Sequence, residues 1–432
     1  MWRLMLALLV VLTVQISAFS TAKAQPALVF DLDTGKVLIA EEAGRPWYPA
    51  SLTKLMTAYL TFQAVQAGRI RLNQKFRISK YAASGGGHGA ARLGVKPGTE
   101  LTVDRMLTFL LVRSDADMAV ALAEAVGGTE KDFVRMMNAA ARRLGMTGTR
   151  FVNPHGMGHP EQVTTARDMG MLAMAIYHHF LKRHPSWWQY FSMRTVKHGK
   201  HRQKNRNKLL YMMKGANGMK TGFICASGFN LLATATRDGR TLAAVVFGRK
   251  SAYTRASFAK IMLEEGFRRL RAGVERRSLS AITQIRNEGG TAPDLSAGIC
   301  KGRTIRMARF EEVSGWGVAY GAYRASVSAE AALEAERLAA GLWKRELPSG
   351  VVRLPGEKAY AGLVWGLGED EAVSACMIAR AHEVKCRLYP PRALAELAAL
   401  VEQERAERKA ARAKRATGAG GRKATSRPVK VN

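Results

Sequence analysis

The sequence is poor in cysteine and in acidic residues. Its 432 residues include four cysteines, Cys225, Cys300, Cys376 and Cys386, and these lack the paired CxxC spacing of a zinc site. The 34 acidic residues are outnumbered by 67 basic ones, which gives a formal net charge of +33. So large an excess indicates an anionic partner: nucleic acid, a membrane surface or an anionic cell-wall polymer. Composition does not choose among the three.

Long apolar stretches are also scarce, since only the N-terminus has one. Residues 1–24 begin with the basic Arg3, continue with an apolar run over 4–14, and end on a small-x-small tripeptide. This pattern is typical of a secretory signal peptide, and the run is shorter than the roughly 20 residues that a membrane span needs. We therefore expect an exported protein, with an uncleaved signal anchor as the alternative.

Export changes how the charge and the cysteines are interpreted. An exported protein is separated from nucleic acid, so we expect its anionic partner in the cell envelope and no nucleic-acid binding. Oxidising compartments permit disulfides. Cys376 and Cys386 lie close together in one small predicted unit and are expected to form a bridge, whereas Cys225 and Cys300 either pair or stay free.

The first half of the chain predicts a layered α/β domain, which we place at residues 25–271. Expected strands cover residues 27–30, 36–40, 231–236 and 241–247, and expected helices cover 51–67, 103–126 (interrupted at 113–115), 133–144 and 257–270. Strands at both ends of a domain with helices between them indicate a mixed β-sheet flanked by helices.

The second half predicts a smaller α+β unit after a linker. Residues 272–314 are expected to be the linker, with one or two strands of their own. In residues 315–391 we expect strands at 316–323, 359–365 and 383–389 and helices at 329–342 and 369–378. Residues 392–432 are expected to form a charged helix and a disordered basic tail. The apolar face of that helix is short, so it supports contact with a membrane surface only weakly.

The tetrapeptide Ser51-Leu52-Thr53-Lys54 is the first candidate for chemistry. Residues three apart share a helix face, so the Lys54 amine can reach the Ser51 hydroxyl. A serine becomes a good nucleophile when a base takes its proton, and a lysine can be that base where burial lowers its pKa. The pattern S-x-x-K alone occurs often by chance.

Two further motifs follow in the chain. Ser114 opens Ser-Asp-Ala-Asp at the break between two predicted helices, where it either relays a proton or simply caps a helix. Lys220-Thr221-Gly222 precedes the late strands, so that Lys220 and Thr221 can present a cation and a hydroxyl to a substrate carboxylate. Gly222 would let a substrate backbone approach closely.

Together these motifs resemble those of the low-molecular-mass penicillin-binding proteins that act as D-alanyl-D-alanine carboxypeptidases. The resemblance covers residues 26–270 in the order of the family's motifs. It implies a β-lactamase/transpeptidase-like fold and a serine enzyme, with no cofactor and no metal. That enzyme removes the terminal D-alanine from peptidoglycan stem peptides and is acylated by penicillins.

The resemblance also assigns roles to residues. It makes Ser51 the nucleophile, Lys54 the base and Ser114 the proton relay, and it places the oxyanion hole at the backbone N–H groups of Ser51 and Phe223. It makes Lys220, Thr221, Gly222, Phe223 and Arg255 the substrate-binding residues, Arg255 by helping to hold the terminal carboxylate. It implies a periplasmic, cell-wall-associated protein that is at most peripheral to the inner membrane.

Two positions depart from the family pattern. Ala116 stands where the family's S-x-N motif has asparagine, and Phe223 stands where relatives often have histidine. Because of Ala116, a catalytically weakened wall-binding protein is an alternative. A β-lactamase is another, with Asp168 or Glu161 as the group that would activate water.

The C-terminal unit has a resemblance of its own. Its strand at 316–323, the helix with Cys376, and Cys386 before Pro390-Pro391 resemble the sporulation-related repeat (SPOR) domain. This resemblance implies binding to peptidoglycan glycan strands that have lost their stem peptides.

Overall fold

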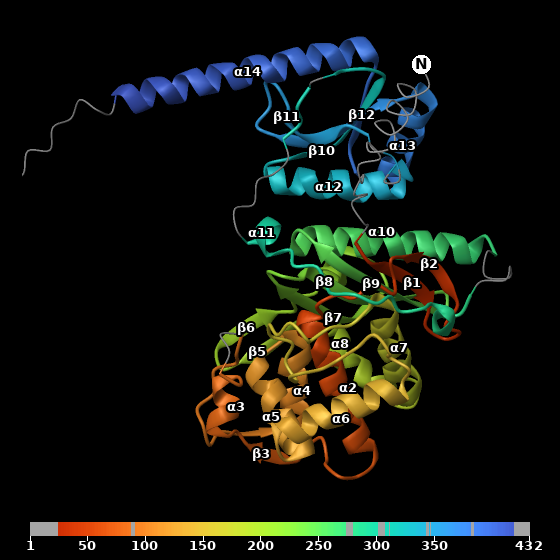
Figure 1. Ribbon diagram of the computed structural model, residues 1–432, viewed down its shortest axis with the longest axis vertical. Helices are drawn as coiled ribbons and strands as arrows, with labels where there is room; N and C mark the ends of the chain where they lie inside the picture. The colour runs from red at the N-terminus through yellow and green to blue at the C-terminus, as the bar shows by residue number, and fades with distance from the viewer. Residues whose placement is uncertain are drawn as a thin grey trace, which may run out of the picture.

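The computed structural model describes residues 25–87, 91–273, 280–300, 307–310, 312–342, 345, 347–381 and 384–418. The predicted signal peptide and the end of the predicted basic tail, residues 419–432, lie outside these residues. The described residues form two modules, which lie one above the other in Figure 1. The N-terminal module runs from β1 to α10, and the C-terminal module runs from β10 to α14.

A five-stranded sheet forms the centre of the N-terminal module, in the order β2-β1-β9-β8-β7. Its strands are β1 (Ala27–Asp31), β2 (Val37–Glu41), β7 (Ala216–Ile224), β8 (Gly228–Arg237) and β9 (Arg240–Arg249). The first strand pairs with the last, so both ends of the domain meet in one sheet, as predicted. Every neighbouring pair of strands is antiparallel. The sheet is therefore antiparallel throughout, and the domain is mixed only in that it combines helices with strands.

Helices cover both faces of this sheet (Figure 1). The helices of this module are η1 (Ala50–Thr53), α2 (Lys54–Gln66), α3 (Lys80–Ser84), α4 (Val103–Val112), α5 (Ala116–Gly127), α6 (Glu130–Arg143), α7 (Ala166–Ile176), η2 (Tyr177–Leu181), η3 (Pro185–Trp188), α8 (Gln189–Ser192), α9 (Leu209–Met212) and α10 (Ala252–Arg271). The long helix α10 packs an apolar side on one face, and the larger core lies on the other face among α2, α4, α5, α6 and α7.

Two small two-stranded sheets and the linker differ from the prediction. The pairs β3 (Lys75–Arg77) with β4 (Glu100–Thr102) and β5 (Thr195–His198) with β6 (His201–Lys204) were not predicted, because their exposed strands carry little apolar periodicity. The described part of the linker holds two short helices, η5 (Ile282–Gln284) and α11 (Ser296–Ile299), and no strand of its own.

The C-terminal module has a four-stranded antiparallel sheet in the order β11-β12-β10-β13. Its elements are β10 (Trp316–Tyr323), α12 (Ser326–Ala339), β11 (Ser349–Arg353), β12 (Tyr360–Leu367), α13 (Glu369–Ala381), β13 (Cys386–Tyr389) and α14 (Pro391–Gly418). The helices α12 and α13 cover one face, while Leu394, Leu397 and Val401 of α14 pack on the other. The predicted strands and helices are confirmed here, and only β11 was missed.

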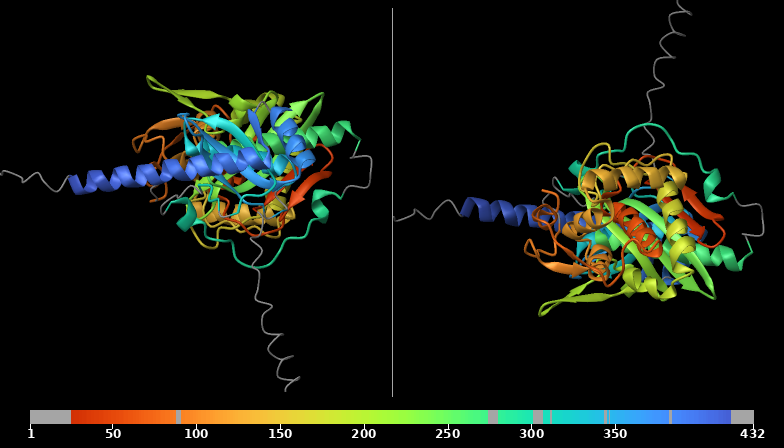
Figure 2. Two further views of the ribbon diagram at one scale, coloured as in Figure 1. Left: turned by 90° about the horizontal axis from the view of Figure 1, so that it is seen from above. Right: turned by 90° about the horizontal axis from the view of Figure 1, so that it is seen from below.

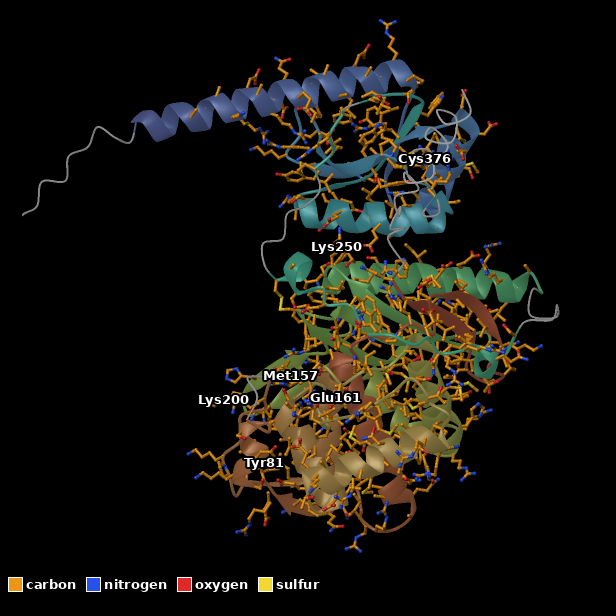
Figure 3. The ribbon with its side chains drawn as sticks, viewed as in Figure 1. Tyr81, Met157, Glu161, Lys200, Lys250 and Cys376 are labelled. Atoms are coloured by element: carbon orange, nitrogen blue, oxygen red, sulfur yellow. A yellow bond between two sulfur atoms is a disulfide. The ribbon has the colours of Figure 1, made fainter. Side chains whose placement is uncertain are left out.

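The two modules meet where α12 lies along α10, which is visible in both Figure 1 and Figure 2. Two ion pairs cross this boundary: Arg249 Nη1 lies 2.6 Å from Glu334 Oε1, and Lys250 Nζ lies 2.9 Å from Glu330 Oε1. Lys250 is labelled at this boundary in Figure 3. Arg249 ends β9, so the C-terminal module contacts the end of a central strand directly.

Both pairs of cysteines form disulfides. Cys376 joins Cys386 within the C-terminal module, as predicted. Cys225 joins Cys300 across 75 residues, which the sequence had left open. This second bridge connects the turn between β7 and β8 to the end of α11.

Candidate active site

Ser51 and Lys54 come together at the start of α2. Ser51 lies in the 3₁₀ turn η1 and is half-buried, while Lys54 is fully buried. The Lys54 Nζ atom donates a hydrogen bond to Ser51 Oγ at 3.1 Å. Ala50, just before the serine, has a positive φ of 49°, a conformation that is costly for a residue with a Cβ and is found preferentially at functional sites. The contact that the S-x-x-K spacing predicts is confirmed.

A loop about 100 residues further along the chain supports this turn. Lys54 Nζ donates to the backbone carbonyl of His155, and Thr57 Oγ1 donates to the carbonyl of Pro154 at 2.7 Å. Gly156 has a φ of +82°, and a Cβ there would clash with the carbonyl of Ala50. This loop was not predicted to belong to the site, although its Asn-Pro-His-Gly run is a turn signal.

Burial lowers the pKa of Lys54 to about 7. Desolvation is the largest cause, because a charged amine is disfavoured away from water. The charge of Asp115 opposes the shift, and that of Arg206 adds to it. A lysine with this pKa is neutral in a large fraction of molecules near neutral pH, which is the state a general base needs.

The segment Ser114–Asp117 lies at the break between α4 and α5, as predicted, and its last two residues already belong to α5. Ser114 does not cap that helix. Ser114 is buried with a φ of +72°, and Asp115 occupies the N-cap position. Ala116 is fully buried, and its N–H donates to the carbonyl of Ala91. Asp117 accepts from the backbone N–H groups of Leu93 and Gly94. This aspartate therefore holds a loop and does not replace the missing asparagine.

Asp115 is buried beside the lysines. Its Oδ2 atom lies 3.0 Å from Arg113 Nε, and it is fully buried. Burial raises its pKa to about 6, against the opposing charge of Arg113. Above that pH Asp115 is an anion, and its charge raises the pKa of Lys54.

The strand β7 brings the third motif to the same place. It is an edge strand of the sheet, and Lys220 and Thr221 on it are buried. A Cβ at Gly222 would lie 2.7 Å from the carbonyl oxygen of Pro49 and 3.3 Å from the N of Leu52. The side of Gly222 on which a Cβ would lie is thus occupied by the turn that carries Ser51, and the approach of a substrate backbone to Gly222 stays a prediction.

Lys220 adds a second buried amine to the site. Its Nζ donates to the backbone carbonyl of Thr221 at 2.9 Å. Burial lowers its pKa well below the ordinary range, and the charges of Lys54, Arg206 and Arg255 add to the effect. A carboxylate bound here would relieve this repulsion, so the site is electrostatically suited to an anionic group.

Phe223 and Arg255 flank the outer end of β7. The Phe223 ring is 41% exposed and lies 4.1 Å, centroid to centroid, from the ring of Phe229. Arg255 is buried, and its Nη1 atom donates to the backbone carbonyls of Gly222 and Asn230 at 3.4 and 3.3 Å. In these contacts Arg255 braces the backbone of β7, and its binding to a substrate carboxylate stays a prediction.

Arg206 is a charged residue of the site that no sequence motif marks. It is exposed, yet its neighbours Asn205 and Asn207 are buried. The side-chain amide of Asn205 donates to the carbonyl of Met193, and that of Asn207 donates to the carbonyl of Gly218. This fixed loop holds the exposed Arg206 where its charge lowers the pKa of both buried lysines.

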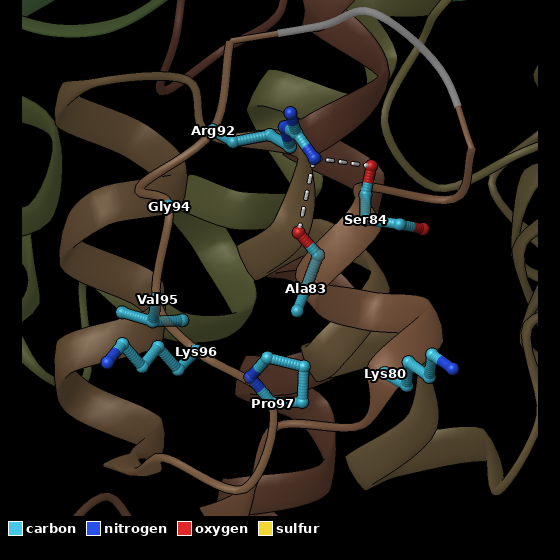
Figure 4. Close-up of a pocket in the computed structure, with 8 residues that line it drawn as sticks. All are labelled: Lys80, Ala83, Ser84, Arg92, Gly94, Val95, Lys96 and Pro97. Atoms are coloured by element: carbon cyan, nitrogen blue, oxygen red, sulfur yellow. Dashed lines mark hydrogen bonds between the residues drawn. The ribbon is translucent and has the colours of Figure 1, made fainter.

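A separate open cavity of about 700 Å³ lies between α3 and residues 92–97 (Figure 4). Three cations, Lys80, Arg92 and Lys96, line it. Arg92 turns back to the carbonyls of α3, while the two lysines lie on opposite sides. The cations therefore do not converge on one point.

The two carboxylates considered for a β-lactamase have other partners. Asp168 is buried and accepts hydrogen bonds from Gly148 N, Thr149 Oγ1 and Asn287 Nδ2. Glu161 lies at the surface, with an oxygen 3.2 Å from Arg150 Nη1. Both carboxylates are engaged in holding neighbouring segments, and neither has the contacts expected of a water-activating base.

The described residues hold no group of three histidine, cysteine, aspartate or glutamate side chains arranged to bind a metal ion. Among the helices that the structure describes, none combines the length and the apolar character needed to cross a bilayer.

A serine beside a neutral buried lysine, facing a cationic strand, is an arrangement suited to acyl transfer. Comparison with known proteins agrees with this class. The family profile of peptidase S11, the D-alanyl-D-alanine carboxypeptidases, matches residues 13–251, which is more than half of the chain. The chain belongs to this family, and the family resemblance inferred from its motifs is confirmed.

Individual relatives match a similar share of the chain. D-alanyl-D-alanine carboxypeptidase DacC of Escherichia coli is 35% identical over 245 residues, which are 56% of this chain and 60% of the relative. DacF of Bacillus subtilis is 34% identical over 247 residues, or 57% of this chain and 62% of the relative. The chain thus spans only about 60% of the length of these curated relatives.

A solved structure supports the fold class. Penicillin-binding protein D2 of Listeria monocytogenes, determined in a cefotaxime-bound form, has 28% identity and a TM-score of 0.51. The match covers 56% of this chain and 97% of that protein. The transpeptidase-like fold predicted for the N-terminal module is confirmed.

Proposed function

We propose that this protein is a serine-type D-alanyl-D-alanine carboxypeptidase that trims peptidoglycan stem peptides. The observation that carries this proposal is the hydrogen bond of 3.1 Å between Ser51 Oγ and the amine of the buried Lys54. Family membership supplies the substrate class, and the cluster of Lys220, Arg206 and Arg255 suits the free carboxylate at the end of such a peptide.

In the proposed reaction Ser51 Oγ attacks the carbonyl carbon of the penultimate D-alanine. Neutral Lys54 takes the hydroxyl proton of Ser51. Ser114 passes this proton from Lys54 to the leaving amine, so that free D-alanine departs. Water then attacks the acyl-enzyme, releasing the shortened peptide and returning the proton to Ser51. The backbone N–H groups of Ser51 and Phe223 would stabilise the oxyanion, and losing one such donor typically costs about 100-fold or more in rate.

We further propose that the protein is exported and acts at the cell wall. The N-terminal signal pattern and the net charge of +33 support this location. β-Lactams are proposed as inhibitors that acylate Ser51, because a relative of the same fold is known with cefotaxime bound. The C-terminal module is proposed to be SPOR-like and to bind glycan strands.

A labelled penicillin tests the proposed function. The wild-type chain should form a covalent adduct that maps to the peptide with Ser51, and it should release D-alanine from a pentapeptide. The Ser51→Ala variant should lose both activities. An undiminished adduct in Ser51→Ala would show that the nucleophile is another residue, and an unreactive wild type would favour the catalytically weakened alternative.

A further inference from the structure

The turn between β7 and β8, residues 224–228, is attached on its inner side to the segment before Ser51. Trp47 Nε1 donates to the carbonyl of Ser227 at 3.0 Å. From β8, Asn230 Nδ2 donates to the carbonyl of Tyr48 at 2.9 Å. The hairpin that carries Lys220 is thus tied to the chain that leads into the nucleophile.

The same turn is also attached to the linker. Cys225 forms the disulfide with Cys300, at a Cα–Cα distance of 5.6 Å. Beside the bridge, Leu295 N donates to the carbonyl of Ala226 at 2.9 Å. Cys225 is two residues beyond Phe223 on the chain. The disulfide is therefore attached directly after the end of β7, close to the residues proposed to bind the substrate.

The attachment matters because β7 is an outer strand with one neighbouring strand, β8. A strand paired on one side has fewer backbone hydrogen bonds to hold it than a central strand. A covalent link at its end removes conformations that would otherwise let the hairpin move away from Ser51.

We propose that the Cys225–Cys300 disulfide is a positioning element of the active site, which keeps β7 and its Lys220 and Thr221 at the working distance from Ser51. This inference rests on the proposed function. Since a misplacement of about 1 Å can cost about 100-fold in rate, loss of the bridge should slow acylation of Ser51 by about tenfold or more. The midpoint of the pH profile should stay in place, because Lys54 is on α2 and is bonded to the His155 loop.

The test compares two disulfide variants of the full chain. Cys225→Ser with Cys300→Ser removes the bridge at the hairpin, and Cys376→Ser with Cys386→Ser removes the bridge in the C-terminal module as the matched control. Acylation by a labelled penicillin is measured against pH for both. We expect the first variant to be slower with an unchanged pH midpoint, and the control to acylate at the wild-type rate.

A second measurement covers the case in which the first variant folds poorly. In the control chain Cys225–Cys300 is the remaining bridge, so a brief treatment with a dithiol converts it to two thiols while the dithiol becomes a cyclic disulfide. The acylation rate should fall by the same factor and recover on reoxidation. Equal rates before and after reduction would overturn the inference, as would a shifted pH midpoint. A wild type that is not acylated at all would instead contradict the proposed function.

Discussion

Burial and the charge of a neighbouring carboxylate shift the pKa of Lys54 in opposite directions, and burial has the larger effect. Its pKa falls to about 7 although Asp115 pulls it upward. Below this pH the amine is protonated and cannot accept the serine proton. We therefore expect acylation to rise with pH through about 7 and then to level off, as measured by penicillin adduct formation at a series of pH values.

Two substitutions should move this midpoint in opposite directions. Asp115→Asn removes an anion that stabilises the charged amine, so the pKa of Lys54 should fall and the midpoint should move to lower pH. Arg206→Gln removes a cation that destabilises the charged amine, so the midpoint should move to higher pH. Shifts of the same sign in both variants would show that another group controls the profile.

Ala116 is the position at which this chain departs from the family motif. Asparagine there could form a hydrogen bond to the substrate, which is worth roughly 0.5–1.5 kcal/mol, or about 2- to 13-fold in rate. We expect Ala116→Asn to speed penicillin acylation and D-alanine release by about this factor. Slower rates for both would mean that Asp115 has become an active part of the site with its own geometry.

At the scale of elements, the approach of β7 to η1 depends on Gly222. A methyl group there would lie 2.7 Å from the carbonyl oxygen of Pro49, so Gly222→Ala should push the strand away from the Ser51 turn. We expect acylation to fall by about tenfold or more, with a loss of about 1–3 kcal/mol in the free energy of unfolding.

A second glycine offers a control for this change. Gly289 is exposed, and a Cβ there would meet nothing within 4 Å. Gly289→Ala should leave both acylation and unfolding close to wild type. If Gly222→Ala acylates as fast as this control, then the close packing of β7 against η1 is not needed for the reaction.

The sequence predicted those elements whose pattern is local and strongly apolar. The strands β8 and β9, the break before α5 and all of β10 follow from periodicity and turn residues. The S-x-x-K contact was predictable because it is made within one helical turn. The support from His155 was not predictable, since it comes from a loop 101 residues away and its position depends on the packing of the whole core.

At the scale of the whole molecule, the glycan binding proposed for the C-terminal module can be tested on the full chain. We expect the full-length Ser51→Ala chain to bind glycan strands without stem peptides better than intact wall, as measured by co-sedimentation. Raising the salt from about 0.15 M to about 1 M shortens the Debye length from about 8 Å to about 3 Å. Binding that is equal for both materials and disappears at high salt would indicate charge attraction alone.

The helix α14 also has a consequence for how the molecule reaches its surroundings. Its apolar residues Leu394, Leu397 and Val401 are already buried against the sheet, so they cannot enter a bilayer while the module stays folded. Beyond Arg405, which still donates to the carbonyl of Ala308, the helix projects past the rest of the described chain (Figures 1 and 2). At about 1.5 Å per residue it extends about 20 Å further. The described end of α14 therefore lies more than a Debye length of about 8 Å beyond Arg405. Charges at that end are screened from the groups that tune Lys54.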